Sequence, residues 1–440
     1  MKYQTPMTET TPITSSSQRR AFMHRYHLRV VLIILATGLY FLANIQRVAI
    51  PGAIFSILQQ DLGASAPAIT ALGSSFMYIY ACCQLIAGVL VGRYGGIRVM
   101  LVGALFFCLG SFIFPYSSSM PWLYFSRALA GLGASSLYLS LVKEIKHSSS
   151  DKNFSILLSF MVLSGFCGGI VANAPFVACV EMIGWRRLML VIALLSMALY
   201  ALFALCSRGV RKPPVRPESR FNLADFIGVF RGRHNLHVCT FSGVNFGMYY
   251  VIQTVIGKKF IEDYCGISSN HAALIFSLMA ILSALSGLTF ATLSRMLGNR
   301  RCLFLRIAGV MGIIDFSIIV LHLVMDWRSP YLVVFFCLLA LTASTAAITV
   351  PLMHETNDPD KAGSAVSIMN FATFISVAIL GNAVGYLMNL YAPLRDASGV
   401  LVYSRASYLA VFLALLALSF FSAYSSWRLQ ETMGKRRIVQ

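Results

Sequence analysis

The residue with the clearest chemistry is an arginine inside an apolar segment. Arg47 lies near the end of the apolar run at 29–50, after Tyr40 and Asn44. An unpaired arginine at the centre of a membrane costs about 2.5–3.5 kcal/mol on insertion scales, so it normally faces a cavity or a partner. Its planar guanidinium matches a carboxylate or a phosphate. Arg47, Tyr40 and Asn44 are therefore predicted to bind an anionic group of a substrate. The alternative is that Arg47 reaches the membrane interface or bonds a neighbouring helix.

A polar stripe in a second apolar run could complete such a site. Asn245, Tyr249 and Gln253 recur every four residues within 236–257. This spacing places them on one face of a helix, and we predict that they line the same cavity. Asn370 is a further candidate from a later run. The alternative for each of them is a hydrogen bond between helices, which is common in membranes.

Asp315 is the one acidic residue deep inside an apolar run, in the sequence GIIDFSII. A carboxyl group in apolar surroundings binds a proton readily, which suits a proton carrier. Asp315 is accordingly a candidate for coupling, although a structural role is the favoured interpretation.

The elements that position these residues are predicted to be membrane-spanning helices. Of the 440 residues, 58% are hydrophobic and 12% are charged, with a mean hydropathy of +0.73. Soluble domains carry about 25% charged residues. A span needs about 20 apolar residues. An all-α membrane protein with twelve transmembrane helices is therefore expected. The predicted spans lie at 29–50, 69–91, 98–116, 121–142, 155–178, 187–207, 236–257, 271–292, 302–323, 331–353, 364–390 and 407–427.

A repeated basic loop indicates two similar halves. Its copies are GVLVGRYGGIR, from Gly88 to Arg98, and ATLSRMLGNRR, from Ala291 to Arg301. Paired halves that enclose a path are typical of transporters. The predicted parts are a cytoplasmic tail at 1–28, a six-helix bundle at 29–207, a cytoplasmic linker at 208–235, a second six-helix bundle at 236–427 and a cytoplasmic tail at 428–440.

The formal charge of +19 does not indicate nucleic-acid binding, because the charges are spread over separate loops. With alternating sides, 25 of the 35 Lys and Arg fall on the side of the termini and 7 in the opposite loops. This bias places both termini in the cytoplasm, with the chain in the cell (inner) membrane.

The ten cysteines have no metal-ligand spacing. No phosphate-binding loop, HExxH or GxSxG occurs, so no metal, cofactor or enzymatic activity is predicted.

Several motifs resemble those of the major facilitator superfamily. GVLVGRYGGIR is similar to the signature between its second and third helices, and the second basic loop lies where that family repeats it. RALAGLGAS, from Arg127 to Ser135, resembles its fourth-helix motif, and IGWRR, from Ile183 to Arg187, its turn between helices five and six. The resemblance implies two pseudo-symmetric six-helix bundles and secondary transport. It also implies coupling or gating roles for Arg127, Gly88, Arg93, Gly95 and Arg98. For Arg127 the alternative is a structural hydrogen bond to backbone carbonyls.

A narrower resemblance concerns bacterial carriers of the phagosomal nutrient transporter type, which are associated with amino acids and nucleosides. It rests on YFLANIQRVAIPG, FIEDYCGISSNHAAL and AGSAVSIMNF. The arginine in the first span also resembles that of organic anion and organophosphate carriers.

One departure from the family signature affects gating. The family loop usually carries an acid three positions before its glycine, and here Gly92 and Arg295 occupy that place. The acid would lie at the N-terminus of the eleventh helix, where negative charge is favoured. The family's charge latch is therefore not expected at these positions.

Taken together, these features predict a monomeric secondary active transporter that moves a small polar solute by alternating access. The solute is expected to be anionic or zwitterionic, for example an amino acid or nucleoside, and the coupling ion a proton. The alternatives are an organic anion or organophosphate carrier, a drug or metabolite efflux antiporter, and a non-transporting sensor on a carrier fold.

Overall fold

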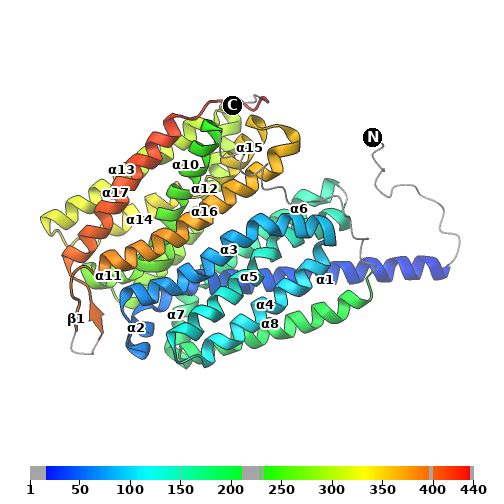
Figure 1. The fold of residues 1–440 in the computed structure, drawn as a ribbon, viewed down its shortest axis with the longest axis horizontal. Helices are drawn as coiled ribbons and strands as arrows, with labels where there is room; N and C mark the ends of the chain where they lie inside the picture. Colours follow the sequence, from blue (N-terminus) through cyan, green and yellow to red (C-terminus); the bar gives the residue numbers. More distant parts are fainter. Residues whose placement is uncertain (1–15, 150, 211–227, 229–231, 396–399, 437–440) are drawn as a thin grey trace.

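The computed structural model describes residues 16–149, 151–210, 228, 232–395 and 400–436, and these are almost entirely helical. Figure 1 shows two groups of helices side by side, which we call the N-terminal half and the C-terminal half. The N-terminal half comprises α1 (Ser16–Ala49), η1 (Gly52–Ile54), α2 (Phe55–Leu62), α3 (Ala66–Tyr94), α4 (Gly96–Tyr116), α5 (Met120–Ser148), α6 (Asp151–Val171), α7 (Ala174–Ile183) and α8 (Trp185–Arg208). The C-terminal half comprises α10 (Arg233–Val251), η2 (Ile252–Ile256), α11 (Gly257–Cys265), α12 (Ser269–Met296), α13 (Arg301–Met325), α14 (Leu332–Leu341), α15 (Ala346–Thr356), α16 (Pro359–Met388), β1 (Leu394–Arg395), β2 (Leu401–Val402) and α17 (Arg405–Trp427).

The predicted spans are recovered with changes in three of them. Within the described residues, ten helices are long and apolar enough to cross a membrane, and a bent pair makes up to eleven. That pair, Ile156–Val171 with Ala174–Ile183, replaces the fifth span and bends by 49°. The tenth span is interrupted between α14 and α15. The seventh consists of α10 and η2, and it is not among these ten helices, since α10 begins with the polar run Arg233–Asn235.

Local sequence explains where several helices begin and end. Pro67 lies in the first turn of α3, where its missing N–H would have no helical partner in any case. The bend after α6 falls just before Pro175, which lies in the first turn of α7 and cannot donate to the preceding turn. In α6, Gly165 and Gly168 allow close packing on α1, since a Cβ at Gly168 would lie 2.7 Å from the Phe41 carbonyl oxygen.

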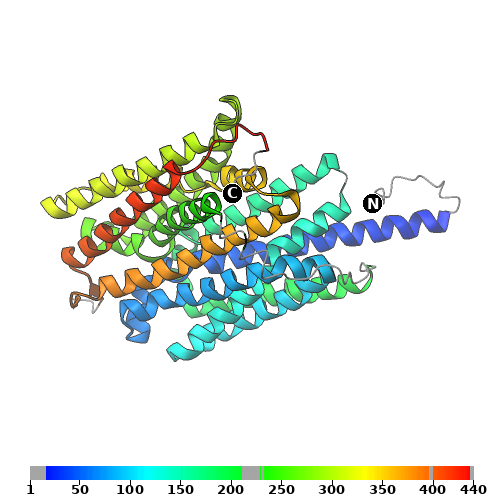
Figure 2. The same cartoon turned by 45° about the horizontal axis from the view of Figure 1, so that its top comes forward.

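The two ends of the helix bundle differ. One end carries α2, α11 and the β1–β2 hairpin, and these elements lie together in both views (Figures 1 and 2). We call it the hairpin end. The hairpin pairs Leu394 with Val402 and Arg395 with Leu401 in antiparallel register. The opposite end carries both basic loops and the start of the described part of α10, and we call it the basic end.

The halves pack tightly at the hairpin end. A Cβ on Gly385 of α16 would overlap the Thr70 hydroxyl of α3, and one on Gly381 would lie 2.8 Å from Ser74 Oγ. Further along the same face of α3, Met77, Ala81 and Gln84 are also buried, at 2%, 0% and 6% exposed. Leu85 of α3 packs against the C-terminal-half cluster that includes Ile368 and Met369 of α16, so the two halves also meet beyond the hairpin end.

The predicted terminal segments differ from those observed. Helix α1 begins at Ser16, so the tail predicted at 1–28 is helical from residue 16 onward. The segment after α17 is bound to the fold, since the Glu431 carboxylate accepts from the backbone amides of Arg301 and Cys302, both at 2.9 Å. These interactions depend on tertiary packing, which the polar sequence of the terminal segment does not reveal by itself. Most of the predicted linker, residues 211–227 and 229–231, lies outside the described residues.

Candidate functional site

Arg47 lies two residues before the end of α1, near the hairpin end. Its Nη2 donates to Asn44 Oδ1 at 2.6 Å, while Asn44 Nδ2 donates to the Tyr40 carbonyl at 2.8 Å. The buried Nε of Arg47 has no hydrogen-bond partner. None of the ion pairs formed by the described residues includes Arg47. The guanidinium thus retains donor capacity and an uncompensated charge.

Tyrosines from both halves surround this charge. Tyr40, Tyr80 and Tyr250 lie close enough to the Arg47 guanidinium to interact with it electrostatically. Tyr250 Oη, from α10, donates to the Arg47 carbonyl at 3.3 Å and so joins the halves at this point. The Tyr80 ring packs edge-on against Phe374 of α16, with centroids 4.8 Å apart. Arg47 therefore lies at the interface of the two halves.

The predicted polar stripe of the seventh span forms its hydrogen bonds inside the C-terminal half. Asn245 Nδ2 donates to the Thr342 carbonyl at 3.1 Å, and Gln253 Nε2 to the Phe276 carbonyl at 2.9 Å. Tyr249 Oη lies 3.4 Å from Gln253 Oε1. These contacts match the alternative of hydrogen bonds between helices.

Asn370, the further candidate for this cavity, lies on α16 and is half-buried. Helix α16 packs against α3 of the N-terminal half and against α10 of its own half. A role of Asn370 in substrate binding stays a prediction.

The helix of the seventh span does not break at a glycine, as its sequence might suggest, but passes through one turn of π-helix at Ile252–Ile256. Single π turns occur frequently at functional sites. Gly257 directly follows this turn, and a Cβ there would overlap the Ile252 carbonyl. It would also overlap the ring of Phe276. The turn lies between Tyr250, which contacts Arg47, and α11 at the hairpin end.

Arg127 is almost fully buried, with 2% of its surface exposed. Its Nε donates to the Leu72 carbonyl and its Nη1 to the Gln46 carbonyl, both at 3.1 Å. Its guanidinium also lies 4.7 Å from the centroid of the Phe76 ring. Arg127 thereby ties α5 to α1 and α3, which corresponds to the structural alternative for this residue.

Asp315 lies on α13 and is 1% exposed, and its Oδ2 has no hydrogen-bond partner. Helix α13 packs mainly on α17 of the same half. Near Asp315 this packing is close, because a Cβ on Gly309 would lie 2.9 Å from Ala423 Cα. The structure places Asp315 between two helices of one half, apart from Arg47 on α1.

The first basic loop is held by residues of α5. Gly95 ends α3 with a φ of +86°, a conformation suited to glycine. Lys143 Nζ donates to the carbonyls of Val91 at 2.6 Å and of Gly92 at 3.1 Å. The Glu144 carboxylate accepts from the Ile97 amide at 3.2 Å, in the first turn of α4. The remaining predicted gating residues of this loop lie as follows: Gly88 has open space beside it, the Arg93 guanidinium lies 5.3 Å from the Tyr94 ring centroid, and Arg98 Nη1 donates to the Tyr94 carbonyl at 3.1 Å.

The second basic loop is also served by carboxylates from outside the loop. Glu431 binds two first-turn amides of α13, and Glu355 of α15 pairs bidentately with Arg301 at 2.8 and 2.5 Å. Negative charge at a helix N-terminus is stabilising. Glu144 and Glu431 thus bind the first turns of α4 and α13, which follow the two loops, and each does so within its own half.

The residues that the sequence did not single out are the tyrosines of the interface, above all Tyr80, Tyr138 and Tyr250. Tyr138 packs against Tyr40 with ring centroids 6.0 Å apart. An available signal was the position of Tyr250 next to the predicted stripe, but sequence alone does not say which helix face meets the other half. No group of three or more His, Cys, Asp or Glu side chains suited to a metal occurs in the described part of the chain.

Comparison with known proteins agrees with this architecture. The family model described as Major Facilitator Superfamily matches residues 36–381. The chain belongs to this superfamily. It is a multi-pass membrane transporter and not an enzyme. The chain is also similar in fold to the crystal structure of the nucleoside transporter NupG, with a TM-score of 0.69, 15% identity, and coverage of 92% of this chain and 100% of that one.

Two curated relatives are similar in sequence. The probable sulfoacetate transporter SauU of Cupriavidus necator is 24% identical over 172 residues, which cover 38% of this chain and 39% of the relative. Sodium-dependent phosphate transport protein 1, chloroplastic, of Arabidopsis thaliana is 23% identical over 205 residues, covering 45% of this chain and 39% of the relative. The chain thus spans about two fifths of the length of each.

Proposed function

We propose that this superfamily transporter carries a small organic anion whose carboxylate, sulfonate or phosphate group binds Arg47. The observation that carries the proposal is a guanidinium at the interface of the halves with an unpartnered Nε and no acidic partner among the described residues. Arg47 is half-buried with its Nε buried, and because charges removed from water are normally paired, a bound anion would supply the missing partner. The names of the two sequence relatives, which refer to sulfoacetate and phosphate, support an anionic substrate.

Transport would proceed by rocking of the two halves about this site. The positive-inside rule makes the basic end cytoplasmic, with both termini on that side. Tight packing at the hairpin end then corresponds to a form closed to the outside. Arg47, with Tyr40, Asn44 and Tyr250, would release the anion inward from this form.

A proton is the proposed coupling ion. A membrane potential that is negative inside opposes entry of an anion by about 2.3 kcal/mol per charge per 100 mV. A proton carried with a monoanion cancels that charge. Uptake into proteoliposomes, with either a proton gradient or a sodium gradient imposed, distinguishes the two ions, because only the coupled ion drives accumulation.

A thermal-shift screen of the purified protein tests the substrate class, since a ligand that binds the folded state raises the Tm. The set consists of sulfoacetate, inorganic phosphate, dicarboxylates, amino acids and neutral sugars and nucleosides. We expect an anion to raise the Tm of the native protein and to lose this effect in Arg47→Ala. A shift with neutral solutes alone, unchanged in Arg47→Ala, would contradict the proposal.

A further inference from the structure

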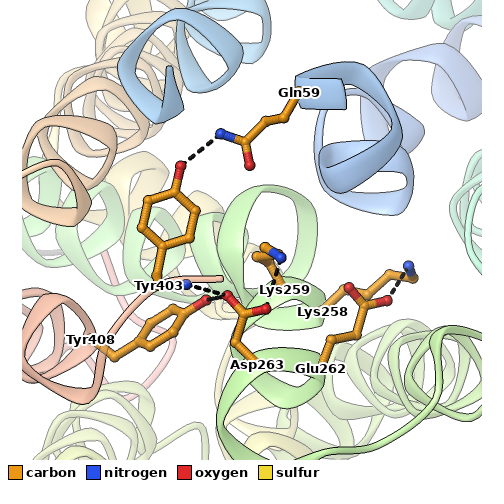
Figure 3. A network of polar contacts seen from close by, with 7 residues as sticks. All are labelled: Gln59, Lys258, Lys259, Glu262, Asp263, Tyr403 and Tyr408. Atoms are coloured by element: carbon orange, nitrogen blue, oxygen red, sulfur yellow. Dashed lines mark hydrogen bonds and ion pairs between the residues drawn. The ribbon is translucent and has the colours of Figure 1, made fainter. Parts of the chain in front are cut away.

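A buried chain of polar contacts crosses between the halves at the hairpin end (Figure 3). It begins on α11 with Lys259, continues through Asp263 to Tyr403 after the hairpin, and ends at Gln59 on α2. It includes no residue of the Arg47 site. A partly buried ion pair, Lys258 with Glu262, lies beside it on α11 without joining it.

In the C-terminal half, this series of polar contacts contains an ion pair that fixes the position of Tyr403. Lys259 Nζ lies 2.7 Å from Asp263 Oδ1, and the two side chains are 2% and 4% exposed. Asp263 Oδ2 accepts from the Tyr403 amide at 3.0 Å and from Tyr408 Oη at 2.7 Å. A buried ion pair contributes little net stability, but the bonds that Asp263 accepts hold the Tyr403 amide and the Tyr408 hydroxyl in place. This arrangement directs the loop after β2 towards α2.

Within this series of contacts, the Tyr403 hydroxyl meets the N-terminal half at Gln59 and at the Ala66 backbone, and the short hydrogen bond is the one to Gln59. Gln59 Nε2, on a side chain that is 3% exposed, donates to Tyr403 Oη at 2.6 Å. Beside it, Gly52 of η1 approaches the backbone of the π turn so closely that a Cβ would overlap the Thr254 carbonyl. The hydrogen bond thus lies in a closely packed surface and is shielded from water.

The series of polar contacts can separate at the Gln59–Tyr403 bond, because the groups on each side keep partners within their own half. Gln59 Nε2 also contacts the Ala64 carbonyl at 3.3 Å, so its amide keeps a partner within the N-terminal half. On the other side, Asp263 keeps Lys259, the Tyr403 amide and Tyr408, all within the C-terminal half. Parting of the halves therefore breaks the Gln59–Tyr403 bond and leaves the buried charges paired.

We propose that the Gln59–Tyr403 hydrogen bond is the latch that keeps the hairpin end closed, and that Lys259 and Asp263 are positioning residues for Tyr403. The ion pair moves with the C-terminal half, while the latch opens and closes once in each cycle. Loss of the latch shifts the equilibrium between closed and open hairpin ends without altering the anion site.

Tyr403→Phe tests the latch, because it removes the hydroxyl and leaves the Tyr403 amide bound to Asp263. The readout is hydrogen–deuterium exchange of the full chain in lipid nanodiscs, followed by mass spectrometry. The Ala174 amide donates across the halves to Ser277 Oγ at 3.0 Å, so its exchange reports their separation. We expect exchange there to accelerate about two- to thirteen-fold, the factor that corresponds to one ordinary hydrogen bond.

Tyr264→Phe is the matched control. Tyr264 is 4% exposed, and its hydroxyl donates to the His322 carbonyl at 3.0 Å within the C-terminal half. It should leave exchange at Ala174 unchanged. Gln59→Met should accelerate exchange like Tyr403→Phe, and the double variant should add nothing further. Unchanged exchange in Tyr403→Phe, equal acceleration in Tyr264→Phe, or additive effects in the double variant would each overturn the latch.

Discussion

Replacing Arg47 by lysine isolates the contribution of the guanidinium fork, because the positive charge remains. In the structure Nη2 is engaged by Asn44 and Nε is the buried donor left without a partner. A lysine ammonium offers donors from one point and cannot bind two oxygens of an anion in a fixed plane. One charge-assisted hydrogen bond is worth about 1.5–3 kcal/mol. Its loss predicts an affinity for the transported anion that is lower by about 10- to 150-fold.

The assay is calorimetric titration of the purified protein with the anion found by thermal shift, followed by uptake into proteoliposomes. Arg306→Lys is the control, because Arg306 lies on α13, where its Nη2 donates to the Leu429 carbonyl at 3.3 Å. We expect Arg306→Lys to retain the native affinity. If Arg47→Lys binds the anion as tightly as the native protein, the argument that the fork binds the substrate is wrong.

Three further predictions concern other parts of the molecule. Asp315→Asn should leave the pH dependence of uptake unchanged, since Asp315 lies between helices of one half; a lost pH response would make it the coupling site. Gly385→Ala should lower the Tm, because the added methyl overlaps the Thr70 hydroxyl and such overpacking costs about 1–3 kcal/mol; Gly88→Ala, in open space, should not lower it. Burial raises the pKa of the Cys265 thiol from 9.0 to about 11. Its alkylation by N-ethylmaleimide at pH 7 should therefore be about a hundredfold slower than that of an ordinary cysteine. The alkylation rate, measured by peptide mass spectrometry, should rise about tenfold per pH unit up to that pKa.

The membrane fold follows from the sequence because hydropathy and charge act over whole segments. Span lengths, the basic loops and the family motifs are local properties, so they predicted the helices and their number closely. The bend after α6 was accessible as well, since Pro175 interrupts hydrogen bonding there. Arg47 could be singled out because a charged residue inside an apolar segment is unusual, however that helix packs.

The partners of Arg47 could not be read from the sequence. Asn245 and Tyr250 differ by five positions, about 140° around a helix, and only the packing of both halves decides which of them meets α1. Gln59 and Tyr403 lie 344 positions apart, one in the short helix α2 and the other in the loop after β2, and neither lies in a motif. Their contact depends on how two rigid halves meet, which is a property of the whole molecule. For Arg127, the hydrogen bonds to carbonyls of α1 and α3 likewise depend on helix packing.

The Glu431 contact determines where the polypeptide can be shortened or extended. Cutting the chain after Trp427, at the end of the last helix, would strip both carboxylate oxygens from the Arg301 and Cys302 amides. Leaving such donors unpaired costs about 1–3 kcal/mol each where they are buried. Residues 428–432, which include the buried Leu429 and Thr432, therefore belong to the folded C-terminal half. An affinity tag or fluorescent reporter is best joined beyond residue 436, with a spacer that keeps its own charges away from the start of α13.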